Sequence, residues 1–105
     1  MRKRFNEGRY WDLLKQGQYI PLVRESRHPA LMLAKEPFCT QSQMVSYVDQ
    51  NNNEIARVHQ YLRPDGTIGA SGKPDPKRLL QGDILYRLKT ARGIAKEIRV
   101  KEDTP

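Results

Sequence analysis

One histidine lies among cationic and aromatic residues in a segment that has the composition of a β-strand. His59 stands between Arg57 and Tyr61 in the run 54–62, which also contains Ile, Val and Leu. Because side chains alternate across a strand, Arg57, His59 and Tyr61 share one face, while Ala56, Val58 and Leu62 share the other. The sequence therefore predicts a polar face that is open to chemistry, backed by a buried one.

The chemistry that these residue types offer is acid–base catalysis at a phosphodiester. An imidazole titrates near neutral pH and can act on a ribose hydroxyl or on a leaving oxygen, while cations stabilise the pentavalent phosphate. We therefore identify His59, Tyr61 and Arg63 as candidate catalytic residues of a metal-independent ribonuclease. The alternative is a structural role for His59, because a lone strand histidine more often has one and no second acid or base is fixed by spacing.

The segment that follows this strand is rich in Gly, Ser and Pro and superficially resembles a phosphate-binding loop. In a P-loop, a glycine precedes the one before Lys by five positions, but here that position holds Thr67. Pro74 also follows Lys73, where a P-loop needs Ser or Thr. The spacing therefore argues against a nucleotide hydrolase.

Small residues in this loop still allow backbone N–H groups to approach an anion, and two lysines add positive charge. A solvent loop that needs glycine only for its turns is the alternative. The residues we expect to contact nucleic acid are cationic or hydroxyl-bearing and lie in the loop or on the nearby strands. They are Arg57, Ser71, Lys73, Lys77, Arg78 and Arg87.

The remaining residue types with chemical potential are more simply explained by structure. Cys39 is the only cysteine, so no internal disulfide or four-ligand cysteine zinc site can form, and an inert thiol is its commoner role. His28 precedes Pro29 and is expected to cap a helix. Four aspartates fall at predicted turns or element ends, and we predict neither a metal site nor a cofactor: Asp49, Asp65, Asp75 and Asp83.

The charge of the chain favours a polyanionic partner. Nineteen Lys and Arg against twelve Asp and Glu give a formal charge of +7, enough to attract nucleic acid. RNA is preferred to DNA because the histidine chemistry would act on a ribose hydroxyl. No run approaches the roughly 20 apolar residues of a membrane helix, and the N-terminal residues lack a secretory pattern, so we expect a cytoplasmic protein.

These residues must be positioned by a small number of elements. The apolar spacing predicts a helix over 5–16 that ends at Gly17, and 18–27 is either an edge strand or an extended connection. Residues 30–36 favour a short helix, with a buried strand as the alternative. Residues 43–49 and 54–62 predict a β-hairpin, since the asparagines between them tolerate turn geometry.

The second half of the chain completes the expected sheet. Asp75 and Pro76 predict the start of a short helix that ends at Gly82, followed by strands over 84–89 and 94–101. The resulting fold class is α+β, with one or two N-terminal helices packed on a three- to four-stranded antiparallel sheet. We expect one domain, 1–105, with 1–4 and 102–105 frayed.

Two readings compete with catalysis. The same face could bind RNA without cleaving it, with cations on phosphates and Tyr61 stacked on a base. A protein-interaction or assembly module would instead use the sheet edge or the apolar segment 30–33.

Overall fold

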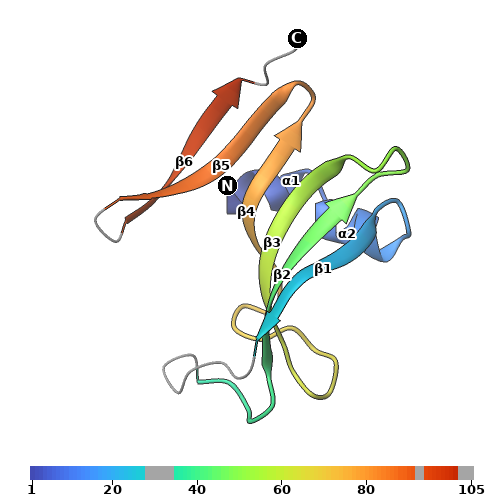
Figure 1. Ribbon diagram of the computed structural model, residues 1–105, viewed down its shortest axis with the longest axis vertical. Coiled ribbons are helices and arrows are strands. Elements are labelled where there is room, and N and C mark those ends of the chain that lie inside the picture. Colours follow the sequence, from blue (N-terminus) through green and yellow to red (C-terminus); the bar gives the residue numbers. More distant parts are fainter. Residues whose placement is uncertain (28–34, 92–93, 102–105) are drawn as a thin grey trace.

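The computed structural model describes residues 1–27, 35–91 and 94–101. This part of the chain forms two short helices followed by six strands (Figure 1). The helices are α1 (Arg2–Glu7) and α2 (Tyr10–Lys15), and the strands are β1 (Ile20–Arg27), β2 (Gln41–Val48), β3 (Glu54–Leu62), β4 (Asp75–Gln81), β5 (Ile84–Ala91) and β6 (Ile94–Lys101).

All six strands belong to one antiparallel sheet, in the order β1-β2-β3-β4-β5-β6. The α+β class is confirmed, but the sheet is larger than the three or four strands expected. The two additional strands are β1 and β4. For β1 the sequence allows either an edge strand or an extended connection. The helix expected over 30–36 lies mostly outside the described residues.

The predicted hairpin is confirmed as β2 and β3. Its turn is held by Asp49, whose Oδ1 accepts hydrogen bonds from the backbone N–H groups of Asn51 and Asn53, both at 2.9 Å. Asn52 adopts a φ of 64°, the left-handed conformation that asparagine tolerates. Local turn chemistry therefore sets this hairpin.

The helix predicted over 5–16 is broken in two. Arg9 has a φ of 56°, so the backbone leaves the helical region between α1 and α2. Gly17 has a φ of 85° just beyond α2, as expected for a helix stop. The break lets Phe5 and Tyr10 stack on one another, with ring centroids 5.8 Å apart.

The helix predicted from Asp75 is wrong, because this segment forms β4. Leu79 pairs with Ala56 of β3, and both are fully buried. Tertiary packing therefore overrides the local preference of an Asp-Pro start for a helix. Pro76 is tolerated because it lies next to a shift in the β3–β4 register, where an irregularity removes the need for a ladder N–H.

Both helices lie on one side of the sheet; in the view of Figure 1, α1 lies behind β3 and β4, and α2 lies behind β1 and β2. Phe5 and Tyr10 from the helices meet inward-facing side chains of the central strands, and the ring of Tyr86 in β5 lies under Arg4. The buried core consists of Phe5, Tyr10, Val45, Tyr47, Ala56, Val58 and Leu79. We call the opposite side of the sheet, which carries Arg57 and His59, the open face.

The N-terminal residues are attached to the sheet, although we expected 1–4 to fray. The Met1 amino group lies 2.8 Å from Glu97 of β6, and Arg4 Nε lies 2.6 Å from the same carboxylate. The hydrogen bond from the terminal amino group is the largest cause that lowers the pKa of Glu97. Residues 102–105, also expected to fray, lie outside the described residues.

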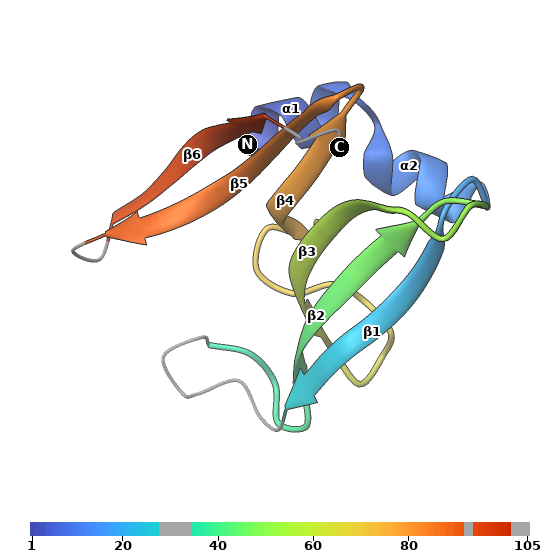
Figure 2. The same ribbon diagram turned by 45° about the horizontal axis from the view of Figure 1, so that its top comes forward.

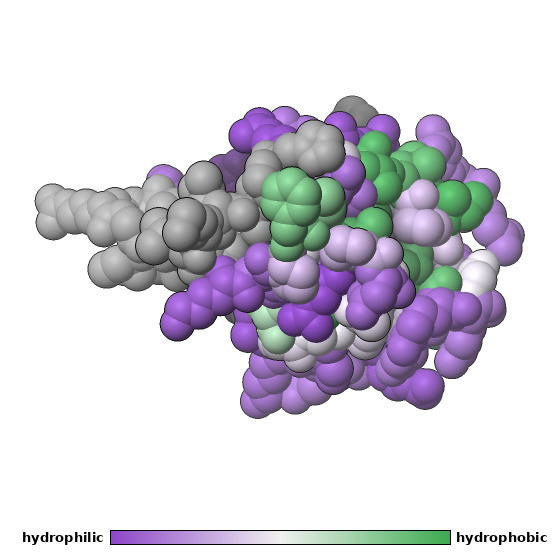
Figure 3. All heavy atoms as spheres, turned by 90° about the horizontal axis from the view of Figure 1, so that it is seen from below, coloured by the Kyte–Doolittle hydropathy of each residue, from purple (hydrophilic) through white to green (hydrophobic). Residues whose placement is uncertain are grey.

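The remaining surface is mostly polar. The β5–β6 hairpin reaches beyond the rest of the sheet (Figure 2), and hydrophilic side chains dominate the end that carries the loops (Figure 3). Ile20 and Val23 of β1 and Phe38 are the exposed large hydrophobic residues among those described. Neither described helix has the length and apolar character needed to cross a membrane.

Leu79→Ala should destabilise the fold by about 2–5 kcal/mol, because it leaves a cavity in a fully buried site. Urea unfolding followed by circular dichroism measures this change. Ile20→Ala, at a position that is 57% exposed, is the control and should change stability by less than about 0.5 kcal/mol. Equal losses in the two variants would contradict the described core.

Candidate nucleic-acid interface

Three arginines stand side by side across the centre of the open face. Arg57 of β3 is the register partner of Arg78 in β4, which is in turn the partner of Arg87 in β5. We call this set the arginine row. Like charges directly opposite one another destabilise a sheet, so the row needs compensation from nearby groups.

Glu54, the first residue of β3, provides the negative charge that offsets this repulsion. Its Oε2 accepts hydrogen bonds from Nε and Nη2 of Arg57, at 3.2 and 3.0 Å, and Arg78 Nε lies 3.7 Å from its Oε1. The fully buried Ser46 also donates to Oε2, at 2.6 Å. One carboxylate thus serves two arginines and leaves the row positively charged.

A fourth arginine extends the charge onto β1. Arg24 Nε donates to Ser46 Oγ at 3.0 Å, and Ser46 is the register partner of Arg57. Arg24 and Arg57 also line one hollow of about 410 Å³ together with Glu25 and Met44. The positive surface therefore runs from β1 to β5.

Three β-bulges determine which side chains reach this face. Register shifts place extra residues at Arg24 in β1, Ile55 in β3 and Lys77 in β4. Residues three apart in a regular strand point to opposite sides, yet a bulge between them brings both to the same side. This explains how Glu54 reaches Arg57, and how β4 presents both Asp75 and Arg78 on the open face.

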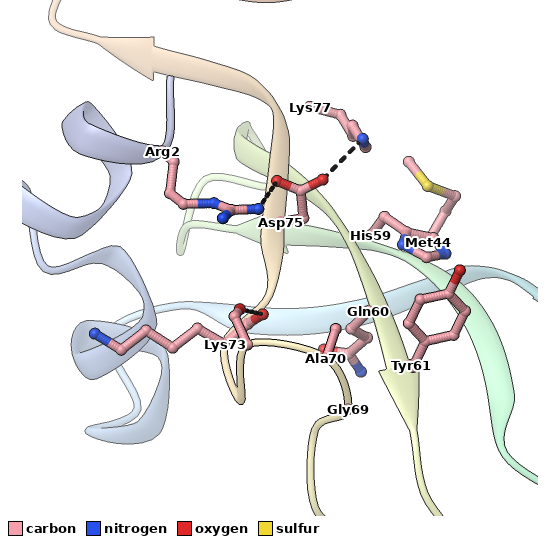
Figure 4. A pocket seen from close by; sticks show the side chains of 11 residues that line it. Arg2, Met44, His59, Gln60, Tyr61, Gly69, Ala70, Lys73, Asp75 and Lys77 are labelled. Atoms are coloured by element: carbon pink, nitrogen blue, oxygen red, sulfur yellow. Dashed lines mark hydrogen bonds and ion pairs between the residues drawn. The ribbon is translucent and has the colours of Figure 1, made fainter. Parts of the chain in front are cut away.

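A larger pocket lies where β3 and β4 separate. Its volume is about 640 Å³, and its walls come from β3, β4, the loop that joins them and the start of α1 (Figure 4). The lining residues are Arg2, Met44, His59, Gln60, Tyr61, Gly69, Ala70, Ser71, Lys73, Asp75 and Lys77. We call this the His59 pocket.

His59 is half-buried in the wall of this pocket. Its Nε2 lies 2.7 Å from Ser42 Oγ on β2, and its ring meets that of Tyr61 edge to face, with centroids 4.8 Å apart. Nδ1 has no hydrogen-bond partner among the residues that the structure describes. Burial, followed by the nearby charge of Lys77, lowers the pKa of His59, while Asp75 acts in the opposite direction. The imidazole is therefore mainly neutral at pH 7 and able to accept a proton.

Asp75 organises the cations of the pocket. Its Oδ1 accepts a hydrogen bond from Arg2 Nη2 at 3.1 Å, and its Oδ2 accepts one from Lys77 Nζ at 2.9 Å (Figure 4). Burial acts to raise the pKa of Asp75, but the bonds from Lys77 and Arg2 together hold it below its ordinary value. Lys73 forms no ion pair within the described part of the chain, and its side chain points away from His59, toward the helices (Figure 4).

The loop beneath the pocket is anchored by a carboxylate. Glu36, whose side chain is 3% exposed, lies 2.9 Å from Arg63 Nε and accepts the backbone N–H of Ala70 at 2.7 Å. A Cβ on Gly69 would collide with this carboxylate, so glycine is needed for the close approach. Arg63, proposed as catalytic from the sequence, is thus placed at the anchor and not at the pocket.

Three hollows on the open face share Met44 in their walls. This residue lines the His59 pocket, the hollow beside Arg24, and a third hollow of about 220 Å³ that also includes His59. These hollows therefore lie next to one another between Arg57 and the His59 pocket.

The structure brings together most of the residues selected from the sequence. His59, Tyr61, Ser71, Lys73 and Lys77 line one pocket, and the three arginines form the adjacent row. Sequence reasoning missed the roles of residues whose positions depend on strand register, because spacing along the chain gives no signal for it. These are Arg24, Ser42, Glu54 and Asp75; Arg2 could be noted only as part of a cationic N-terminus.

Within the described ranges, no three His, Cys, Asp or Glu side chains are grouped so that they could hold a metal ion. No protein-family model, curated protein or solved structure matches the chain. The argument for function therefore depends on the geometry of the open face.

The His59 ring should titrate below its ordinary midpoint of about 6.5, because burial and Lys77 disfavour the charged form. Asp75→Asn should lower the midpoint further and Lys77→Gln should raise it. Because the pKa of His59 is lower in the folded protein than in the unfolded chain, the unfolded chain binds more protons as the pH falls. The contribution of His59 to stability is therefore lost as the pH falls from about 6.5 through the pKa of the folded protein. NMR of the imidazole protons measures the three midpoints. Shifts of the same sign in both variants would contradict the described electrostatics.

Proposed function

We propose that this protein is an RNA-binding domain that holds the phosphate backbone of a single strand on the open face of its sheet. The observation that carries the proposal is the arginine row, in which Arg57, Arg78 and Arg87 occupy directly opposed positions on three strands. Such an arrangement costs stability through repulsion, and a bound polyanion would relieve that repulsion.

The type of cation supports phosphate as the ligand. A guanidinium presents a planar set of donors that matches two phosphate oxygens, which a lysine does not. Adjacent strands are about 4.8 Å apart, so the outer members of the row are attached about 10 Å apart. A flexible strand can adjust its phosphates to this spacing.

The surroundings of the row support a single strand over a duplex. Neighbouring hollows on the face offer space for unstacked bases, and Tyr61 provides an aromatic ring at one end. Sequence-tolerant recognition of single strands combines stacking with a cationic groove in this way. Because Arg78 and Arg57 share one counter-charge, the face keeps an excess of positive charge for the backbone.

Binding of a fluorescent single-stranded RNA should weaken steeply with salt, with a log–log slope of about −0.7 for each phosphate contacted. Arg87→Gln should reduce the slope by about one contact and weaken binding of every sequence similarly. Arg99→Gln is the matched control, because Arg99 pairs with Tyr86 and so lies on the helix-covered face of the same hairpin. Fluorescence anisotropy over a salt series gives both quantities.

An RNA affinity that is absent at low salt, or that falls equally in both arginine variants, would overturn this proposal. The exposed apolar residues Ile20 and Val23 on the edge strand β1 would then direct the search to a protein-interaction or assembly role. Binding through such an apolar contact should respond little to salt.

Glu54→Gln should tighten RNA binding and lower the stability of the free protein. The amide can still accept the hydrogen bond from Ser46, but it no longer offsets the charges of Arg57 and Arg78. Anisotropy and thermal unfolding of the same sample measure the two effects. Weaker binding in a variant that remains folded would contradict the role assigned to this carboxylate.

A further inference from the structure

The His59 pocket combines a proton acceptor, a hydroxyl group and cations around a space that opens beside the arginine row (Figure 4). We propose that this pocket cleaves RNA by attack of a ribose 2′-hydroxyl on the adjacent phosphate. The inference rests on the proposed function, because the row must hold the strand, and it adds a reaction carried by a separate set of side chains.

The position of His59 suits a general base. One ring nitrogen, Nε2, is held by Ser42, and when it carries the proton and donates it to Ser42 Oγ, Nδ1 keeps a free lone pair. Half-burial and the charge of Lys77 keep the ring neutral at pH 7. The imidazole can then take the proton from a 2′-hydroxyl placed in the pocket.

The charge of the pocket favours the transition state. Arg2 and Lys77 supply two positive charges beside Asp75, which removes one, so this group keeps one positive charge in excess. The side chain of Lys73 extends from the pocket wall toward the helices, away from His59 (Figure 4). The pentavalent phosphorane of this reaction carries a charge near −2. Cations held in place before the reaction stabilise such charge without reorganising, and Asp75 binds both Arg2 and Lys77.

Tyr61 is the proton donor in this scheme. Its ring touches that of His59, and its half-buried side chain lines the same pocket. The 2′-oxygen forms a bond to phosphorus as His59 removes its proton, the bond from phosphorus to O5′ breaks, and O5′ takes the proton of Tyr61. The products are a 2′,3′-cyclic phosphate and a 5′-hydroxyl, and solvent returns one proton from His59 to Tyr61, so the reaction balances without a co-reactant.

Ser42 acts as a positioning residue, because it touches His59 and selects its tautomer. Loss of its hydroxyl should lower kcat about tenfold and leave KM unchanged. Ser42→Thr keeps a hydroxyl at this position and should restore the rate. A purely structural role would not produce this pattern.

The experiment incubates the full chain with a 5′-fluorescent 12-nucleotide RNA in the presence of EDTA, with product ends identified by mass spectrometry. Matched strands of DNA and of 2′-O-methyl RNA lack the nucleophile and should be bound but remain intact. His59→Ala, His59→Gln and Tyr61→Phe should each lower the cleavage rate about 100-fold or more, with RNA affinity changed less than about twofold. Tyr86→Phe, on the helix-covered face, is the control for the loss of a phenol and should cleave normally.

The outcomes separate this inference from the proposed function. If the protein binds RNA in a salt-sensitive way but leaves it intact, the proposed cleavage is wrong and the proposed RNA-binding function is retained. Cleavage that persists in both His59 variants, or that also cuts the 2′-O-methyl strand, would overturn the assigned mechanism. Two substitutions are made at His59, and circular dichroism shows whether each variant folds. If one variant fails to fold, the other tests the mechanism.

Discussion

The register of β4 against β3 is the constraint on which the rest of the structure depends. One extra residue, Lys77, separates the pairing of Arg78 with Arg57 from the pairing of Asp75 with His59. Without this bulge, Asp75 and Arg78 would point to opposite sides of the sheet. Either the arginine row would then lose Arg78, or the His59 pocket would lose Asp75. The same shift lets Pro76 and Leu79 both reach the core. A single irregularity thus serves packing and the open face together.

Both clusters on the open face follow one electrostatic plan. In each, a carboxylate is shared by two cations: Glu54 by Arg57 and Arg78, and Asp75 by Arg2 and Lys77. Sharing holds the cationic side chains in defined positions while leaving net positive charge. Full pairing would neutralise the surface, and no pairing would leave the arginines to repel one another. The result is a surface that keeps positive charge for an anion while each carboxylate offsets part of the repulsion between its cations.

The parts of the fold that the sequence predicted correctly are those whose signals lie within a short stretch of the chain. The β2–β3 hairpin was predictable because alternation and the Asn-rich turn are both short-range, and alternation also placed Arg57, His59 and Tyr61 together. β4 was not, since Asp-Pro resembles a helix start and only the contact of Leu79 with Ala56 decides for a strand. The partnership of Ser42 with His59 and the anchoring of Arg63 by Glu36 depend on register and loop closure. Neither leaves a pattern in the spacing of residues.

The edge strand β1 has a consequence for how molecules of this protein meet one another. Its backbone faces solvent on one side and could pair with a second copy, and Ile20 and Val23 are exposed there. Three features oppose such pairing: Pro21 lacks a donor, the irregularity at Arg24 bends the strand, and Glu25 and Arg27 add charge at its end. The bulge that delivers Arg24 to the open face therefore also protects the protein against sheet extension and aggregation.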